Sequence, residues 1–599
     1  MHPALAASLA VRLAVALTLR TAFAPDEYWQ SLEVAHRLVF GYGHLTWEWA
    51  VGLRSFAHPL LFAGPYTMLL ALRLDTPWAV VRVPLLLQAL AATATDLYVA
   101  ATAALLFGQS AARWTLACQL ASWFNAYCLG RTYSNSLEAA LAAAGTHHWL
   151  LSRPTGAPSA QSSHGRANRS SSSREKQQGG RETRATRLSA AAQRRHQRAW
   201  LACAALSVVF RPSSALFWVL PAALELARQR GGARRALLGD AVLIGGGLLG
   251  AAGLVDRVGY GHWVAVPWEF FRFNLLAGAS AQYGGHPWHW NITQGLPTVA
   301  ASLLPLLVAG LAWTGSTEAR MPALLAGWSL AVYSLPAHKE FRFLLPALQL
   351  LMPYCGLAAA SLLGSSSSSS SRGSSSQRQA RSAAAAGRAG APAAARAGPR
   401  RPAAWQRRGA AACLLLQLPM AAYFVLVHQG AQVGVMRLIR HEAAAKPSTS
   451  VLFLTPCHAT PYYSHIHAPI PMRFLDCSPP QHAAATSALN AAEEAWLPLP
   501  AACPTASPGE QLSQRRCFER DPPAYLAAVL EGSADAGTHA LPPDRWPRLL
   551  VGYAPVMHHL GAQLRRWGYA PRARLRNCWV QTDDDSPCEL QLWALGEAA

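Results

Sequence analysis

Long apolar stretches, separated by short polar or charged connections, dominate the chain. About 20 apolar residues are enough to cross a bilayer as a helix. Eleven stretches approach or exceed that length, so the pattern predicts a mainly α, polytopic membrane protein, although several are too short to settle the number of spans. They lie near residues 4–24, 58–74, 78–107, 111–130, 137–151, 200–226, 236–255, 296–313, 321–335, 343–363 and 410–428.

The composition agrees with this class. Of the 599 residues, 52% are hydrophobic and only 14% are charged, whereas a typical soluble protein has about 25% charged residues.

Two Ser- and Arg-rich segments interrupt the apolar pattern. Residues 152–199 hold 11 basic and 2 acidic residues, and residues 364–409 hold 9 basic and no acidic ones, so they carry most of the net charge of +22. Neither segment interleaves aromatic residues with its arginines, as a surface for single-stranded nucleic acid does. We therefore expect no nucleic-acid partner, and we interpret both as disordered cytosolic loops that follow the positive-inside rule.

These loops define the predicted domain organisation. The parts are a membrane module at 1–151 with a first lumenal loop at 25–57, a second module at 200–363 with a lumenal loop at 256–295, a last transmembrane helix at 410–428 and a lumenal domain at 429–599.

The predicted orientation constrains the number of spans. Both basic loops should face the cytosol, and the polar motifs near residues 26 and 338 should share the other side. This parity requires two long apolar stretches to fold as two short membrane helices each. We expect one break within 78–107 and the other at Arg211-Pro212, where a proline follows a polar residue.

The segment 429–599 is predicted to be a water-exposed domain of α/β-like character. Strand-like pieces such as Val451–Leu454 and Leu549–Val551 alternate with proline-rich stretches. An even number of cysteines in an oxidising compartment permits disulfides, but the spacing leaves their pairing open. Six of the 11 cysteines lie here: Cys457, Cys477, Cys503, Cys517, Cys578 and Cys588.

Two adjacent carboxylates, Asp26 and Glu27, directly follow the first apolar stretch. Acids near the start of a helix are common in soluble proteins, but carboxylates at a membrane edge are costly and usually functional. Neighbours on a helix diverge by about 100°, so the two cannot act on one atom. We expect one to be catalytic and the other to be structural or auxiliary.

A second charged motif, His338-Lys339-Glu340-Phe341-Arg342-Phe343, lies between two later apolar stretches. Basic side chains there can simply reach for the membrane surface, but the acid among them favours a functional site. Acid at one membrane edge and base at another indicate chemistry on a lipid-linked phosphate.

A third motif, Gly285-His286-Pro287-Trp288-His289-Trp290, precedes the sequon Asn291-Ile292-Thr293. No carboxylate or cysteine accompanies His286 and His289, and such residues are common at membrane interfaces, so we predict no metal site. Asn291 is a candidate for N-glycosylation in the 256–295 loop.

These motifs resemble those of the lumenal mannosyltransferases that use dolichyl-phosphate-mannose. His338 to Phe343 is similar to the H-K-E-x-R-F signature of that family. The run P-D-E-Y-W-Q-S-L-E-V, followed by Y-G-H-L-T-W-E-W and L-R-S, resembles the first lumenal loop of the GPI mannosyltransferase 3 type. G-H-P-W-H-W and the C-terminal runs P-C-H, P-Y-Y-S-H and P-M-R-F-L resemble the same type. The resemblance covers nearly the whole chain outside the two basic loops.

The resemblance implies a GT-C enzyme of the endoplasmic reticulum membrane with a lumenal active site. It would transfer mannose from dolichyl-phosphate-mannose to the second mannose of the GPI-anchor precursor, in α1,2 linkage. Its partners would be the donor, the precursor glycolipid and membrane lipids, with no cofactor. A β-linked donor and an α product require inversion and therefore one carboxylate base. Because dolichyl phosphate leaves readily, the site needs cations more than a general acid.

On this basis we expect Asp26 to be the base, with Glu27 as the substitute. Lys339, Arg342 and His338 would stabilise the phosphate, and Glu340 would orient them. Further candidates for substrate contacts are Arg54, Trp29, His286 and His289.

Two alternative functions stay open at this stage. A sibling mannosyltransferase acting on the N-glycan precursor would share the signature, although the C-terminal motifs argue against it. A non-catalytic lipid transporter would also place charges in a membrane cavity, but the chain lacks the internal repeats typical of such proteins.

Overall fold

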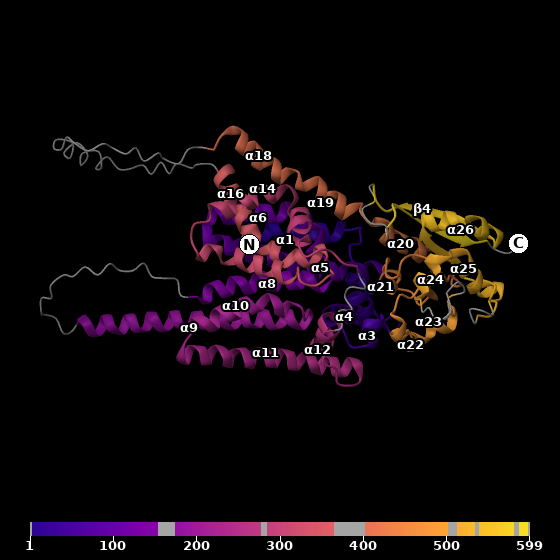
Figure 1. Ribbon diagram of the computed structural model, residues 1–599, viewed down its shortest axis with the longest axis horizontal. Helices are drawn as coiled ribbons and strands as arrows, with labels where there is room; N and C mark the ends of the chain where they lie inside the picture. The colour runs from indigo at the N-terminus through magenta and orange to yellow at the C-terminus, as the bar shows by residue number, and fades with distance from the viewer. Residues whose placement is uncertain are drawn as a thin grey trace.

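A bundle of long helices and an α/β domain at one of its ends make up the molecule (Figure 1). The computed structural model describes residues 3–153, 174–276, 284–364, 402–500, 503, 512–533, 538–579, 581 and 586–596.

The helices of the bundle confirm the mainly α fold class. They are α1 (Pro3–Thr18), α4 (Ala57–Ala71), α5 (Pro77–Phe107), α6 (Gln109–Ala121), α7 (Trp123–Cys128), α8 (Ser134–Ser152), α9 (Arg174–Phe210), α10 (Ser214–Arg228), α11 (Gly231–Tyr260), α13 (Leu296–Ala300), α14 (Leu304–Trp313), α15 (Met321–Val332), α16 (Leu345–Leu363), α18 (Ala404–Leu415) and α19 (Gln417–Leu426). Short helical turns in the connections are η1 (Tyr28–Leu32), α2 (Glu33–Phe40), α3 (Trp47–Ala50), α12 (Val266–Phe271), η2 (Arg272–Leu276), η4 (Asn291–Gly295), η5 (Ala301–Leu303), η6 (Glu318–Arg320) and η7 (Phe341–Leu344).

Five helical stretches of the described chain are long and apolar enough to cross a membrane: Pro77–Phe107, Gly231–Tyr260, Asn291–Trp313, Phe341–Leu363 and Ala404–Ala445. The protein is therefore a multi-pass membrane protein. α9, α16 and α18, which flank the two basic segments, reach the end of the bundle away from the α/β domain (Figure 1).

One of the two predicted helix breaks is confirmed and the other is wrong. α9 ends at Phe210 and α10 begins at Ser214, so the chain breaks at Arg211-Pro212 as predicted. α5, in contrast, runs unbroken for 31 residues although it contains Pro84. Neighbouring helices can accommodate the backbone group that such a proline frees within a membrane bundle.

The predicted disordered loop at 152–199 is also wrong in part, because α9 already begins at Arg174. Residues 154–173, and 365–401 of the second basic loop, lie outside the described residues.

α16 lies at the centre of the bundle and is buried on nearly all sides. Two glycines permit its close packing. A Cβ atom at Gly356 would collide with Thr115 of α6, and one at Gly310 of α14 would collide with the backbone of Tyr354. Small residues serve this purpose in membranes, where the hydrophobic effect does not drive helices together.

The C-terminal domain contains one mixed five-stranded sheet in the order β2-β1-β3-β5-β4. β1 pairs in parallel with β2 and β3, whereas β5 pairs antiparallel with β3 and β4. The strand-like pieces at 451 and 549 are indeed strands. The elements are α20 (Gly430–Ala445), β1 (Val451–Phe453), α21 (Tyr463–Ile466), β2 (Met472–Phe474), α22 (Pro480–Leu489), α23 (Ala491–Trp496), α24 (Gln514–Arg520), α25 (Pro522–Leu530), η8 (Pro543–Arg545), β3 (Leu549–Tyr553), α26 (Ala554–Arg566), β4 (Tyr569–Arg576) and β5 (Glu589–Leu595).

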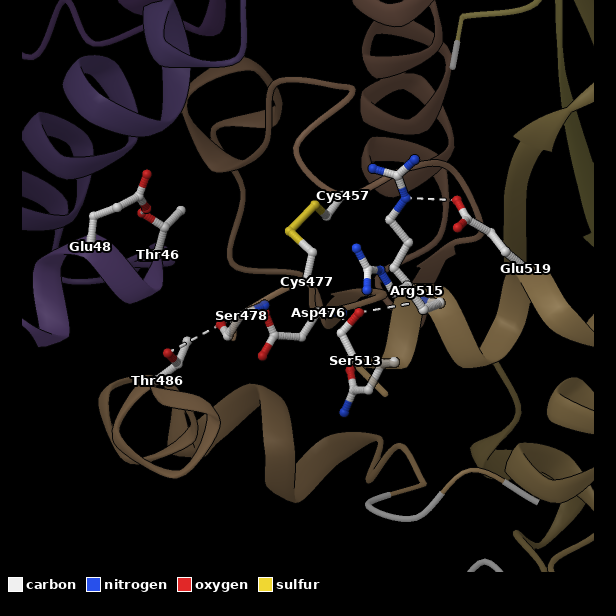
Figure 2. The surroundings of a disulfide bond; sticks show 12 residues. Thr46, Glu48, Cys457, Asp476, Cys477, Ser478, Thr486, Ser513, Arg515 and Glu519 are labelled. Atoms are coloured by element: carbon white, nitrogen blue, oxygen red, sulfur yellow. Dashed lines mark hydrogen bonds and ion pairs between the residues drawn. A yellow bond between two sulfur atoms is a disulfide. The ribbon is translucent and has the colours of Figure 1, made fainter. Parts of the chain in front are cut away.

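All six cysteines of this domain form disulfides, which confirms the prediction and supplies the pairing. The bridges join Cys457 to Cys477, Cys503 to Cys517 and Cys578 to Cys588. Figure 2 shows the first bridge, with Asp476 and Ser478 beside Cys477. Thr46 and Glu48 of the first polar loop (residues 25–57) lie across from it.

The first polar loop is held tightly against this domain. The Glu33 carboxylate, which is fully buried, accepts hydrogen bonds from the backbone N–H groups of Tyr462 and Ser464 and from the Ser464 hydroxyl. The Trp29 indole N–H donates to the carbonyl of Thr460 at 3.0 Å. These contacts fix the segment that carries Asp26 and Glu27.

A buried ion pair ties α1 to α5. Arg12 donates to both oxygens of Asp96, at 2.9 and 2.8 Å, and both side chains are nearly inaccessible. Arg12→Leu should therefore lower the free energy of unfolding by about 3–5 kcal/mol, because it leaves a buried charge unpaired. Thermal unfolding of the detergent-solubilised protein measures this loss.

The double variant Arg12→Leu/Asp96→Leu is the matched control. It removes both charges and should regain much of the lost stability. Equal stability of Arg12→Leu and the unsubstituted protein would show that the pair does not hold the two helices together.

Candidate active site

Arg342 connects the two charged motifs that the sequence singled out. Its guanidinium lies 2.6 Å from Asp26 Oδ2 through Nη1 and 2.6 Å from Glu340 Oε2 through Nε, and Nη2 donates to Glu340 Oε1 at 2.7 Å. All three nitrogens therefore already face carboxylates. Asp26 and Glu340 stay partly exposed, whereas Arg342 is buried.

Asp26 opens the helical segment that leads into η1 and follows the exposed Pro25. Its neighbour Glu27 turns the other way and is 2% exposed. Arg131 donates to both Glu27 oxygens, at 3.0 and 2.9 Å, and the backbone N–H of Phe23 donates to Oε1 at 2.8 Å. The predicted divergence of the two carboxylates is thus present, and Glu27 has a structural environment.

His338 and Glu340 form the outer edge of this cluster. His338 Nε2 lies 2.8 Å from Glu340 Oε1. Burial raises the pKa of Glu340, but the adjacent Arg342 and His338 more than offset it, so the pKa lies well below its ordinary value. Glu340 therefore remains an anion that holds Arg342 in place, in agreement with its expected orienting role.

Lys339 does not face the site. It is 3% exposed, and its Nζ donates to the backbone carbonyls of His286 and Pro336 at 2.9 and 2.6 Å. Its ammonium group thus holds the loop around His286 and does not join the cluster of Asp26, Glu340 and Arg342, so a contact between Lys339 and the phosphate remains a prediction. The loop is also held by a backbone hydrogen bond from His286 to Ala337.

Trp29 is likewise unavailable to a substrate, contrary to expectation. It is 3% exposed and packs against His458, Tyr462 and Phe474 of the C-terminal domain. An indole that fills a protein core cannot stack on a sugar, so its role here is to join the first loop to that domain.

Arg54 is the least committed cation near the site. Its only ion pair with a described residue is a long one, 3.8 Å to Glu48, and its Nε is buried without a hydrogen-bond partner in the described part of the chain. Arg54 and Asp26 both act electrostatically on the buried His58 of α4. Arg54 thus belongs to the same region as Asp26.

The sequence comparisons agree with this arrangement of motifs. A profile of the Alg9-like mannosyltransferase family matches residues 4–467. The chain belongs to this family. It is 37% identical over 472 residues to mannosyltransferase APTG1 of Arabidopsis thaliana, with 79% of this chain and 76% of that protein aligned. It is 30% identical to GPI alpha-1,2-mannosyltransferase 3 of Homo sapiens over 79% of this chain and 71% of that protein.

The fold is similar to that of a solved membrane glycosyltransferase. ArnT from Cupriavidus metallidurans, in its structure with undecaprenyl phosphate, superposes with a TM-score of 0.52 over 99% of this chain and 98% of that chain, at 11% identity. The similarity supports the GT-C fold class.

This Alg9-like mannosyltransferase brings three further residues to the site that the sequence did not single out as site residues. Asn135 donates to the carbonyl of Arg342 at 3.5 Å and accepts from Arg211 at 3.0 Å. Arg211 pairs with Glu138 at 3.2 Å and lies over the ring of Phe343. Glu138 offered a signal, because it is an acid within an apolar stretch. Arg211 marked only the predicted helix break.

The remaining motif residues lie to one side of the cluster. The ring of the exposed His286 stacks on Trp290, and Nδ1 of the half-buried His289 lies 3.1 Å from the Thr293 hydroxyl. Neither bonds directly to Asp26 or Arg342, so their substrate contacts remain a prediction.

The structure argues against Asn291 as a glycan acceptor. Its side chain is 1% exposed, its amide donates to Ser334, and it begins one of the candidate membrane spans. A glycan cannot be accommodated at a buried amide inside the helical bundle. The sequon identifies an asparagine of the type that is glycosylated, but it does not reveal that this side chain is buried.

Among the described residues, Cys457, His458 and Cys477 come close enough together to suggest a metal site. Both thiols are consumed by the Cys457–Cys477 disulfide. Since the thiolate form is the metal ligand, this group does not fit a metal ion while the bridge is intact.

Glu27→Gln should reduce stability, because it removes the negative charge opposite the fully buried Arg131. Breaking such a pair costs about 3–5 kcal/mol, which a lower unfolding temperature in detergent would reveal. Asp26→Asn is the matched control, since Asp26 is partly exposed and should tolerate the change. A Glu27→Gln protein as stable as Asp26→Asn would contradict the structural role of Glu27.

Proposed function

We propose that this mannosyltransferase transfers mannose from dolichyl-phosphate-mannose to the second mannose of the GPI-anchor precursor, forming an α1,2 linkage. Relatives that carry the name GPI alpha-1,2-mannosyltransferase 3 support the acceptor and the linkage. The observation that carries the proposal is the difference in environment between two adjacent acids. Asp26 is partly exposed beside the motif Arg342, whereas Glu27 is buried in an ion pair.

Asp26 is the base in this proposal. Inversion at the anomeric carbon requires one carboxylate to take the proton of the acceptor hydroxyl as the new bond forms. Glu27 cannot do this from its ion pair with Arg131 without leaving that arginine unpaired. Arg342 holds Asp26 and is therefore a positioning residue for the base.

The leaving phosphate needs positive charge at the moment the glycosidic bond breaks. Lys339 is used elsewhere, so the available cations are His338, Arg342 and Arg54. A phosphate can bind to Arg342 only by competing with Asp26 or Glu340 for its N–H groups. We infer that donor binding loosens the pair between Arg342 and Asp26 and leaves Asp26 able to accept a proton. Arg54, with its unpartnered Nε, is the further phosphate ligand.

The proposed setting is the membrane of the endoplasmic reticulum with the site on the lumenal side. The three disulfides of the domain that packs on the first loop support an oxidising compartment. The direct displacement needs no cofactor and no metal ion.

Complementation tests the function as a whole. Cells that lack the third GPI mannose accumulate a precursor with two mannoses, and expression of this chain should remove that intermediate and restore GPI-anchored surface proteins. Persistence of the intermediate, with the protein present in the membrane, would contradict the acceptor. Extension of a truncated N-glycan precursor, in cells that lack the corresponding sibling enzyme, would favour the sibling function.

Asp26→Asn should abolish mannose transfer and leave the protein folded. Loss of a general base typically lowers the rate by about 10² to 10⁴. Initial rates in membranes with dolichyl-phosphate-mannose measure the loss, and Glu318→Gln, which alters an exposed acid outside the site, is the control. Near-normal turnover of Asp26→Asn would remove the base assignment.

Arg342→Lys should also impair catalysis although it keeps the charge. The single ammonium group of lysine cannot reproduce the contacts of the planar guanidinium, which faces Asp26 and both oxygens of Glu340. We expect kcat/KM for the donor to fall by about tenfold or more, since a charge-assisted hydrogen bond contributes about 1.5–3 kcal/mol. Unchanged kinetic constants would contradict this role and would indicate that Arg342 only anchors the chain at the membrane surface.

A further inference from the structure

A cavity of about 350 Å³ lies next to η1, and neither Asp26 nor Arg342 is among its lining residues. Glu27 and Tyr28 form part of its wall, and Asp26 does not line it. The remaining wall comes from the end of α1, the start of α5 and the start of α20, with His465 of α21. The cavity is thus separate from the site described above.

Four arginines converge on this cavity: Arg20, Arg82, Arg437 and Arg440. Arg82 is 8% exposed, and one of its nitrogens donates to the carbonyls of Ala16 and Leu19 at the end of α1. Arg440 donates to the carbonyl of His465. Within the described chain, Arg20 and Arg437 make no side-chain hydrogen bond or ion pair.

No free carboxylate balances these charges. Glu27 is the one acid among the lining residues, and both of its oxygens are bonded to Arg131. The positive field is felt by His465, whose pKa is lowered to about 3 by burial and by the charges of Arg82, Arg440 and Arg437. Like charges that line one cavity repel one another, and a bound anion relieves this repulsion.

One side of the wall is apolar and reaches the outside of the bundle. Leu17, Val81 and Leu85 line the cavity, and Trp78 at its edge is 61% exposed. Trp78 belongs to the first turn of a candidate membrane span, where tryptophan is typical of the level of the lipid head groups. A charged end and an apolar side at that depth match a lipid with an anionic head group.

We propose that this cavity binds the phosphate of a membrane lipid head group, with the lipid chains lying along α1 and α5. Arginine presents parallel N–H donors to phosphate oxygens, and four arginines, of which Arg82 is buried and Arg20 and Arg437 are exposed, suit an anionic phosphodiester. Besides the mannose donor, two kinds of lipid carry a phosphodiester with a net negative charge, which the zwitterionic phosphatidylcholine lacks. They are the phosphatidylinositol-based acceptor, which rests on the proposed function, and a bulk anionic phospholipid.

The test uses the full-length protein in nanodiscs of phosphatidylcholine, with and without phosphatidylinositol as the probe. Phosphatidylinositol should raise the unfolding temperature of the unsubstituted protein, because it binds the folded state. Arg20→Gln/Arg437→Gln should lose most of this rise, with lipid affinity reduced about tenfold or more. In pure phosphatidylcholine the same double variant should be at least as stable as the parent, since repulsion is relieved.

Arg73→Gln is the matched control, because Arg73 is exposed just before α5 and does not line the cavity. It should keep the full response to phosphatidylinositol. An unchanged response in Arg20→Gln/Arg437→Gln, or an equal loss in Arg73→Gln, would overturn the proposal.

Kinetics then identify the source of the phosphate. A raised KM for the acceptor, with KM for dolichyl-phosphate-mannose unchanged, assigns the cavity to the acceptor. Lost lipid response with both constants unchanged assigns it to a bulk phospholipid. A raised KM for the donor alone would overturn the separation from the catalytic site. If no mannose transfer occurs at all, the proposed function fails, but the nanodisc measurement still decides lipid binding.

Discussion

The buried pair of Glu27 and Arg131 fixes the geometry on which the site depends. Arg131 is fully buried and also donates to the carbonyls of Thr21 and Tyr127, so the turn after α1 and the turn before α8 share one cation. A buried charge is tolerated only when it is paired and hydrogen-bonded. Once Glu27 is held there, the neighbouring Asp26 must point away, and it meets Arg342.

Around this pair, polar contacts join segments that are far apart in the sequence. Glu33 binds the backbone at Tyr462 and Ser464, and Lys339 binds the carbonyls of His286 and Pro336. Each contact satisfies backbone groups that a loop would otherwise leave unpaired away from water. These contacts hold the loops of the site in fixed positions. Catalysis requires this, because the base must be correctly placed relative to the acceptor hydroxyl.

Much of the fold and part of the site follow from the sequence. The period and length of apolar stretches predicted the bundle, Arg211-Pro212 predicted a helix break, and the placement of the acids and of the 338–343 motif predicted the residues that meet. Residue type does not, however, reveal which groups a charged or aromatic side chain contacts. Lys339 and Trp29 have the chemistry of ligand contacts, but carbonyls and aromatic rings of the protein take up that chemistry. Asn135 shows no sequence pattern at all, because its neighbours at the site come from other helices.

The fold alone does not define the reaction, since a chain 11% identical shares it. The charge balance at the site is more informative. Two carboxylates, those of Asp26 and Glu340, surround the single guanidinium of Arg342, and this excess of acid opposes the approach of a phosphate. The lysine of the signature motif does not offset this charge at the cluster, because its ammonium group bonds to the carbonyls of His286 and Pro336. Arg54 lies outside the motif, and its only ion pair with a described residue is a long one, so in the proposed mechanism it adds the positive charge that Arg342 shares with two carboxylates.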